Sequence, residues 1–418
     1  MRIRKKRTGR RNREICRSPR RFPRRAKCSI LAASSTGFRR FLTLKNLVLI
    51  GAGHAHVEVI RRFAEAEAKT RAGAALSVIS PYGKVPYTGM APGFVAGKYS
   101  FDEIAIDAQA LTRAAKGAFV KAHAVSIDRS ARRVLCDDGS IIAYDLLSID
   151  IGGVSRNPFA ASQSVISVKP LEPFIDRIDD LVAQGKDAPI AIIGGGAGGT
   201  ELAAALAQRG ANVALIAGKD GLLPKNPQAA RNAARKILAA RAVQLIEGAD
   251  VVAVDCGALT LDDGRSIDAA AAILAAGVSA PPLLQTLGLP LDEKGFLAVD
   301  EMLKSPEDAR IFAAGDCASI NAGVNGGLRK AGVYAVRAGP VLAGNLLASL
   351  AGRPLRKFHP QSDFLAILSF WPERAVAVKG GFSLAGGWVD RWKEWIDRRF
   401  VARYAPPDAL GGQTNDDA

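Results

Sequence analysis

The chain has 418 residues, and its 48% hydrophobic and 23% charged content is that of a globular protein with room for two or three domains. Its five cysteines show no CxxC spacing, which excludes a disulfide framework and a zinc site and favours a reducing, cytoplasmic setting. The net charge of +17 belongs almost wholly to residues 1–43, which hold 16 of the 57 Lys and Arg residues and one acid.

Residues 1–43 carry little apolar content, so we expect a basic disordered tail. Three interpretations stay open: binding of nucleic acid or anionic lipid, a targeting segment, and an upstream extension that is not normally translated. We favour the third, because the folded pattern begins cleanly at Leu44. For the nearly neutral folded part we expect no nucleic-acid partner. We expect no secretory signal, because no apolar run follows the basic stretch.

The stretch "NLVLIGAGHAHVEVIRRFAEA" from Asn46 predicts a strand, a glycine turn and a helix, followed by a second strand at 75–80. Gly51 and Gly53 stand where a dinucleotide-binding turn needs them, so that backbone N–H groups at a helix N-terminus approach a pyrophosphate. His56 stands at the position of the usual third glycine.

Two hypotheses stay open for the histidines of this turn. Either His54 or His56 hydrogen-bonds the phosphate region of the cofactor, or His56 is only a bulkier packing residue. A metal role is not expected for the pair, because no third ligand is evident beside His123 and His359.

A second unit, "PIAIIGGGAGGTELAAALAQRG" from Pro189, repeats the pattern with a complete GxGxxG at Gly194, Gly196 and Gly199. A strand at 212–217 follows the predicted helix. Two such units predict an α/β protein with two dinucleotide-binding domains.

In each unit the second strand normally ends in an Asp or Glu that binds a ribose, but neither unit has an acid at this position. Ser80 ends the first and Ala217 the second. Lys219 could meet a 2′-phosphate, or it is a solvated loop charge, so NADPH is as credible as NADH.

The late motif "FAAGDCA" places Gly315 and Asp316 after a buried strand. The Asp316 carboxylate either bonds the ribityl chain of a flavin or caps the following segment.

Two glycine-turn units and a late "AAGDCA" resemble the FAD-dependent pyridine nucleotide-disulfide oxidoreductase superfamily, over residues 44–350. That superfamily of two-dinucleotide-binding flavoproteins includes type II NADH dehydrogenases. The stretches "GAGHAHVEVIRRFA", "VPYTGMAPGFVAGKYS", "SIDIG" and "WKEWIDRRF" are similar, more narrowly, to the family found fused N-terminally to selenide, water dikinase. No dikinase domain follows here.

The resemblance implies two Rossmann-like domains of the glutathione-reductase type plus a C-terminal α+β segment. The FAD-binding domain would be discontinuous, at 44–158 and 272–345. The NAD(P)-binding domain would span 159–271, and residues 346–418 would form the C-terminal segment with an amphipathic helix.

The resemblance also assigns site residues. FAD would lie against the first turn, the end of the second strand and the late Asp motif, through Gly51, Ala52, Gly53, His54, His56, Ser80, Tyr87, Val125, Gly152, Gly315, Asp316 and Ala331. NAD(P)H would lie on Gly194, Gly196 and Gly199. The catalytic residues would be Lys330, at the far edge of the flavin, and Glu201, near the nicotinamide. The alternative for Glu201 is an exposed first-turn acid favoured by the helix dipole.

A flavin beside a nicotinamide carries out hydride transfer. Residues 82–94 contain no cysteine, so we expect no redox disulfide and predict electron transfer to a quinone-like or other small acceptor. The alternative is a flavoprotein without turnover, acting as a redox sensor or as a partner in selenium metabolism.

The last predicted helix, 388–404, places Trp388, Trp392, Trp395, Ile396 and Phe400 at helical spacing among basic residues. Such a helix lies in a membrane interface near a quinone, or packs on its own domain or on a second subunit of a homodimer. We therefore expect a cytoplasmic protein or one peripheral to the inner face of the membrane. No transmembrane helix is expected, because the longest apolar run stops at Pro281.

Overall fold

A computed structural model of the chain describes residues 45–405 apart from 68, 69, 72, 160, 161, 163, 256, 321–327 and 373. The expectations for residues 1–43 and for Cys256 lie outside the described residues. All described residues belong to one compact unit.

Five parallel strands form the first sheet, in the spatial order β21-β9-β1-β2-β5. Parallel sheets are covered on both faces and therefore read as continuous apolar runs. In β1, Leu47, Val48 and Leu49 are fully buried. The bounds are β1 Asn46–Ile50, β2 Ala75–Ile79, β5 Ala118–Val120, β9 Leu146–Ile149 and β21 Ile311–Ala313.

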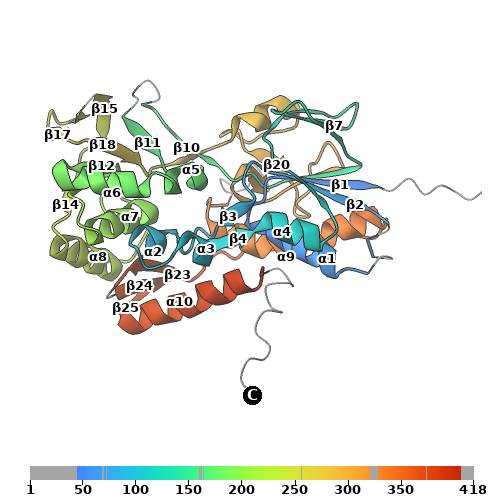
Figure 1. Cartoon of the computed structure of the whole chain (residues 1–418). Helices are drawn as coiled ribbons and strands as arrows, with labels where there is room; N and C mark the ends of the chain where they lie inside the picture. The colour runs from blue at the N-terminus through green and yellow to red at the C-terminus, as the bar shows by residue number, and fades with distance from the viewer. Residues whose placement is uncertain are drawn as a thin grey trace, which may run out of the picture. The chain divides into compact units, whose positions relative to one another are not determined.

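Helices cover one face of this sheet. α1 His54–Glu65 and α9 Gly332–Leu350 lie side by side, and α4 Ala108–Ala114 contacts α1 (Figure 1). Gly339 permits the close approach, since a Cβ there would lie 3.0 Å from the Cβ of Glu58. The other face packs on β6 Ala124–Asp128, β7 Arg133–Cys136, β8 Ile141–Ala143 and the 3-10 helix η1 Pro282–Leu287.

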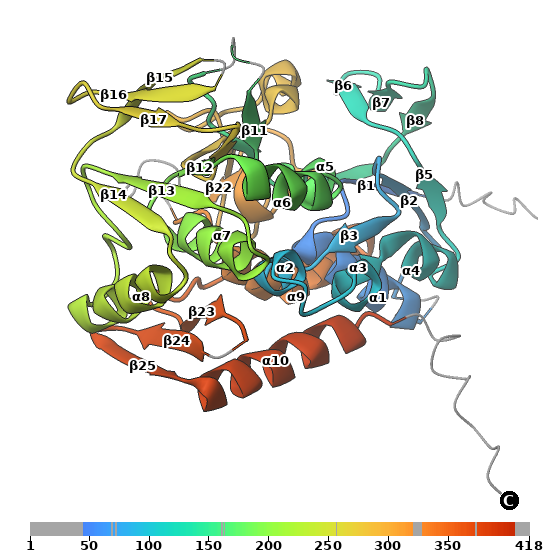
Figure 2. The same ribbon diagram turned by 60° about the vertical axis from the view of Figure 1, so that its left-hand side comes forward.

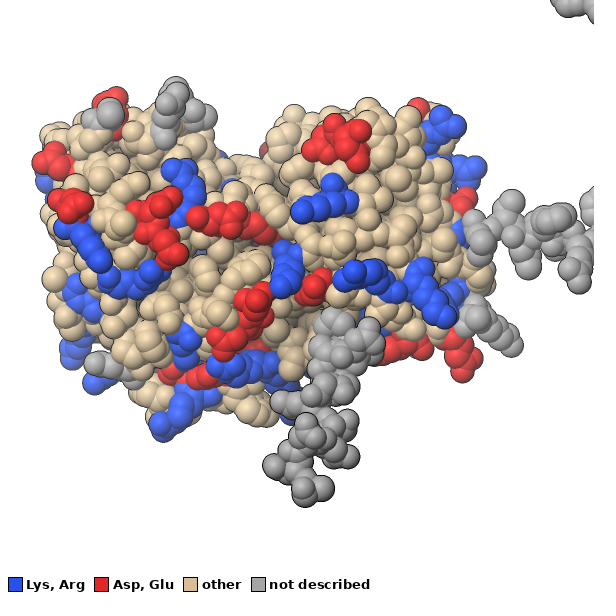
Figure 3. All heavy atoms as spheres, viewed as in Figure 1, with Lys and Arg blue, Asp and Glu red and all other residues tan. Residues whose placement is uncertain are grey.

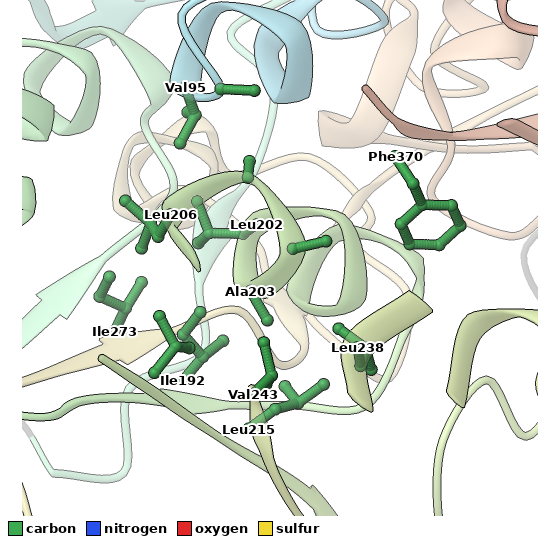
Figure 4. Close-up of a cluster of buried hydrophobic side chains, with 14 of the residues drawn as sticks. Val95, Ile192, Leu202, Ala203, Leu206, Leu215, Leu238, Val243, Ile273 and Phe370 are labelled. Atoms are coloured by element: carbon green, nitrogen blue, oxygen red, sulfur yellow. The ribbon is translucent and has the colours of Figure 1, made fainter. Parts of the chain in front are cut away.

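The second sheet is also parallel, in the order β11-β18-β12-β13-β14. Figure 4 shows its core, where Leu202 and Leu206 lie over Ile192 and Ile273. The antiparallel strands β15 Val251–Asp255, β16 Ala258–Leu261 and β17 Ser266–Asp268 pack on its other face. The bounds are β11 Val165–Ser167, β12 Ile190–Ile193, β13 Val213–Gly218, β14 Gln244–Glu247 and β18 Ala271–Leu274, with α6 Ile178–Asp187, α7 Ala197–Gln208 and α8 Gln228–Ala240.

The chain passes between the sheets at one antiparallel pair, β10 Val154–Ser155 with β19 Val278–Ser279. In chain order, four strands of the first sheet precede the second sheet, and the fifth, β21, follows it. The predicted α/β class with two Rossmann-like sheets is confirmed.

Short elements join these layers. β3 pairs antiparallel with β4, and β20 pairs parallel with β22. α2 contacts α7, which connects the segment after β2 to the second sheet. The bounds are β3 Lys84–Pro86, α2 Ala91–Val95, α3 Phe101–Ile104, β4 Ala105–Asp107, α5 Leu171–Ile175, β20 Leu297–Val299, η2 Gly315–Cys317 and β22 Ala318–Ile320.

The C-terminal segment is an antiparallel sheet with one helix, α10 Gly387–Ala402, packed on it (Figure 2). Its strands are β23 Ala366–Phe370, β24 Arg374–Lys379 and β25 Phe382–Gly386. Val389 and Phe400 of α10 are buried, whereas Trp388, Trp392 and Trp395 are exposed. The residues of the predicted apolar stripe therefore do not share one environment, because Phe400 lies about a third of a turn around the helix from the three tryptophans.

Among the described helices, α9 is long and apolar enough to cross a membrane by length and composition alone. It does not stand out as an apolar run in the sequence, because Arg337 interrupts the segment. Its contacts with α1 are those of a core helix, with Leu342 and Leu346 buried in the first domain's core.

Charges of both signs are interspersed over the face of the molecule seen in Figure 3. Ion pairs join oppositely charged side chains among the described residues, as in Arg235 with Glu247 and Lys84 with Asp102.

Candidate cofactor site

A cavity of about 760 Å³ opens at the carboxyl ends of the first sheet's strands, where open α/β sheets bind their ligands. It is lined by the β1–α1 turn, the end of β2, the loops after β9 and β21, and the start of α9. The predicted residues that line it are Gly51, Ala52, Gly53, His54, Ser80, Gly152, Gly315, Asp316, Lys330 and Ala331.

The β1–α1 turn needs both of its glycines. Gly51 has φ +86°, and a Cβ there would lie 2.3 Å from the carbonyl oxygen of Asp150. A Cβ at Gly53 would lie 2.5 Å from the Asp150 carboxylate. Asp150 was not predicted as a site residue. Its signal in the sequence is an acid directly after the buried run of β9.

His56 differs from its expected role as a cofactor ligand. The side chain is fully buried, and Nδ1 lies 2.6 Å from the carbonyl oxygen of Gly51. A carbonyl only accepts, so Nδ1 donates there, and Nε2 accepts from the Ser148 hydroxyl at 2.8 Å. Burial lowers the pKa of His56 to about 4, so the ring is neutral. The geometry favours the packing hypothesis: His56 ties the turn to β9.

His54 is the first residue of α1 and lines the cavity. Its Nε2 is buried and has no hydrogen-bond partner among the described residues. Burial lowers the pKa of His54. The ring packs 5.5 Å from that of Tyr87 and 6.2 Å from that of Phe400. An orphaned polar atom in a cavity wall is expected to meet a ligand, so His54 is the better candidate of the two histidines.

Asp316 lines the cavity and forms a 2.5 Å ion pair with Lys169. Lys169 was missed, because it lies 147 residues away in sequence in a linker with no motif. Lys330 donates to the Ala318 carbonyl at 2.6 Å and lies 3.8 Å over the Phe296 ring. Burial lowers the pKa of Lys330.

Besides His56, two predicted FAD contacts lie outside the cavity lining. Tyr87 stacks 4.4 Å from Phe400, and its neighbours Pro86 and Thr88 line the cavity instead. The prediction for Val125 concerns the backbone near it; the Val125 side chain is 44% exposed, and the neighbouring residues 122–124 line the cavity.

The second turn has the geometry of a complete GxGxxG. Gly194 has φ +129°, and Gly196 caps α7. A Cβ at Gly199 would lie 2.0 Å from the carbonyl oxygen of Gly194, so only glycine allows this helix-to-strand approach. At the end of β13, Lys219 forms a 2.5 Å ion pair with Asp262.

Glu201 is not an exposed first-turn acid. Its carboxylate accepts a 2.7 Å hydrogen bond from Ser369 N of β23, and burial raises its pKa to about 7. Lys393 of α10 faces it, and Lys393 Nζ also donates to Asp397 and to the Gly89 carbonyl. The inner face of α10 was missed because the aromatic residues dominated its pattern.

The cysteines offer no redox pair among the described residues. Cys136 and Cys317 are both buried and free. Burial raises the pKa of Cys317 to about 12, which keeps the thiol protonated and unreactive. The described residues also contain no cluster of His, Cys, Asp and Glu that could hold a metal ion.

Comparisons with known proteins agree with this geometry. The family model described as "Pyridine nucleotide-disulphide oxidoreductase" matches residues 45–339. The NADH dehydrogenase-like protein YutJ of Bacillus subtilis is 25% identical over 287 residues, 66% of this chain and 78% of that protein. Demethylphylloquinone reductase NdbB of Synechocystis is 26% identical, over 64% of this chain and 70% of that protein. Among solved structures, NDH2 from Plasmodium falciparum superposes with a TM-score of 0.70 at 14% identity, covering 87% and 99% of the two chains.

Proposed function

Because the chain belongs to the pyridine nucleotide-disulphide oxidoreductase family, we propose that it passes electrons from NADH or NADPH to a quinone-like acceptor. It is an FAD-dependent oxidoreductase that uses NAD(P)H. The cavity at the carboxyl ends of the first sheet, with its glycine turn and orphaned His54 nitrogen, carries the proposal.

The residues of the cavity fit FAD. Its volume of about 760 Å³ suits a dinucleotide-sized ligand. The turn at Gly51 and Gly53 brings the backbone and the α1 dipole to a pyrophosphate. Asp316 and Lys330 would hold the ribityl chain and the flavin edge. When bound, the flavin accepts a hydride from the nicotinamide and hands electrons on.

NAD(P)H would lie on the turn of Gly194, Gly196 and Gly199, with Gly198 at the cavity wall. Glu201 and its partner Ser369 would position the nicotinamide end. A half-buried carboxyl with a pKa of about 7 exchanges a proton at neutral pH, which suits an acceptor that takes up protons on reduction. Glu201→Gln should lower the turnover rate and flatten its pH profile between pH 6 and 8, and an unchanged profile would remove Glu201 from this role.

The acceptor is proposed by elimination and by similarity. Among the described residues the two cysteines are buried, and the Cys317 thiol stays protonated, so neither supports disulfide chemistry at the proposed FAD site. One relative is named a demethylphylloquinone reductase. The proposal is tested by mixing the NADH-reduced enzyme with a water-soluble short-chain quinone, a disulfide and oxygen in turn. Fastest reoxidation by the quinone is expected, and faster reoxidation by the disulfide would contradict the proposal.

The exposed aromatic side chains of α10 and β25 support contact with a membrane, where a lipid quinone would be reached. We call this group of Phe382, Leu384, Trp388, Trp392 and Trp395 the aromatic patch. Arg399 lies 5.5 Å over the Trp395 ring, so the patch combines aromatic and basic groups as interfacial helices do. A homodimer remains a further prediction, to be tested by light scattering.

A further inference from the structure

The helix α1 presents its N-terminus to a side chain rather than to open space. Oδ2 of Asp150 accepts from Ala55 N at 2.8 Å and from His56 N at 3.1 Å. These are first-turn N–H groups with no partner inside the helix, the ones that a dinucleotide turn normally offers to a pyrophosphate. The anion position of α1 is therefore already filled by a carboxyl group.

Asp150 is fixed in this position. Its side chain is only 3% exposed, and it also lines the cavity. Cβ atoms at Gly53 and Gly315 would lie 2.5 Å and 2.3 Å from Oδ1, so the carboxyl group fills the gap between the two glycine loops. The same contacts show that a side chain at Gly53 or Gly315 would displace this carboxyl group.

The groups that face Asp150 do not neutralise it. Asp150 forms no ion pair within the part of the chain that the structure describes. His54 of α1 lies close enough to interact, but its pKa is lowered by burial. Asp316 and the protonated thiol of Cys317 face it from η2, and Lys169 is engaged by Asp316. Burial raises the pKa of Asp150 to about 6. An ionised Asp150 would repel a pyrophosphate placed on the same helix end.

We propose that Asp150 binds the cofactor as a neutral acid, so that loading FAD onto the apoprotein takes up one proton. Oδ2 keeps the two N–H groups of α1, while protonated Oδ1 donates a hydrogen bond to a phosphate oxygen. The carboxyl group then bridges the N–H groups of α1 and the pyrophosphate by hydrogen bonds, instead of competing with the pyrophosphate for those N–H groups. The inference rests on the FAD site assigned above.

The linkage has a defined sign. Below about pH 6, Asp150 is already protonated in the apoprotein, and the dissociation constant of FAD is independent of pH. Above that pH the apoprotein has lost this proton, and binding of FAD must restore it to Asp150, so the dissociation constant rises about tenfold per pH unit. The carboxamide of an Asp150→Asn variant cannot ionise, and it keeps both a hydrogen-bond donor and an acceptor.

The test is a titration of apoprotein with FAD, followed by flavin fluorescence from pH 5.5 to 8.5. The wild type should show the tenfold slope above pH 6. Asp150→Asn should show none and should bind FAD up to about a hundredfold more tightly than the wild type at pH 8. A His54→Gln variant controls for the titratable side chain of α1 that interacts with Asp150, and it should keep the slope.

Calorimetry on the wild type measures the proton uptake on FAD binding directly, without a variant. Binding heats at pH 7.5 in two buffers of different ionisation enthalpy should give an uptake approaching one proton. No proton uptake, or a slope retained in Asp150→Asn, would overturn the role of Asp150 while leaving the FAD site intact. An apoprotein that binds no FAD at any pH would overturn the site and the inference together.

Discussion

His56 shows how one residue replaces a glycine at the closest approach of helix and strand. The ring fills the space that a third glycine would have closed, and its two nitrogens bind Gly51 O and Ser148 Oγ. Together these hydrogen bonds require the neutral ring, because Nε2 must accept from Ser148. The His56 side chain, rather than a direct helix-to-strand backbone contact, thus holds the β1–α1 turn.

That neutral state makes stability depend on pH. The unfolded chain protonates His56 near pH 6.5 and the folded chain only near pH 4, so acid favours unfolding. Between pH 7 and pH 4.5 this group should remove about 2.5 kcal/mol of unfolding free energy. Urea denaturation of the apoprotein should show this loss in the wild type and a loss smaller by that amount in His56→Gln. Equal losses in both proteins would contradict a buried neutral His56.

Asp262 is expected to disfavour NADPH. Its carboxylate pairs with Lys219, the cation that follows β13, and it would add a negative charge near the 2′-phosphate of NADPH bound at the proposed site. Asp262→Asn should raise kcat/KM for NADPH relative to NADH by about fivefold at most, because exposed ion pairs of this kind are screened by solvent and contribute little.

A matched control lies next to Asp262 in sequence. Asp263 pairs with Arg265 rather than Lys219, so Asp263→Asn makes the same charge change without releasing Lys219. Equal shifts in both variants would indicate a general charge effect and not a role for Lys219.

At the scale of elements, α10 has two faces with different tasks. Its inner face carries Asp390, Lys393 and Asp397. Asp390 pairs with Lys98, whereas Lys393 donates to the Gly89 carbonyl and pairs with Asp397 one turn along the helix. Its outer face carries the three tryptophans of the aromatic patch. The helix therefore packs on its own chain and still leaves an apolar surface exposed.

Replacing the three tryptophans of the aromatic patch with serine should abolish most binding to vesicles of phosphatidylcholine and phosphatidylglycerol, because buried aromatic area drives interfacial binding. Co-sedimentation measures the bound fraction. The control replaces the exposed Leu135, Ile141 and Val252, three apolar residues outside the patch, with serine. Loss of binding in the control as well, or retention in the tryptophan variant, would contradict a membrane role for the patch.

At the scale of the whole molecule, the sequence predicts what local geometry dictates. Gly51, Gly194 and Gly315 adopt positive φ, and Gly53 and Gly199 leave no space for a Cβ. The glycine turns could therefore be predicted from the sequence. Lys169 with Asp316, and Glu201 with Ser369, join residues 147 and 168 positions apart. Such pairs follow from how the layers pack, which no local pattern encodes.

The central claim is that NAD(P)H and a quinone-like acceptor exchange electrons through FAD in this chain. Its most direct test is anaerobic mixing of the FAD-loaded protein with NADH or NADPH, followed by a short-chain quinone, with the visible absorbance of the flavin recorded throughout. We predict that at least one nicotinamide bleaches the flavin and that the quinone restores its colour. A flavin that stays oxidised with both nucleotides would contradict the account and would favour a flavoprotein without turnover.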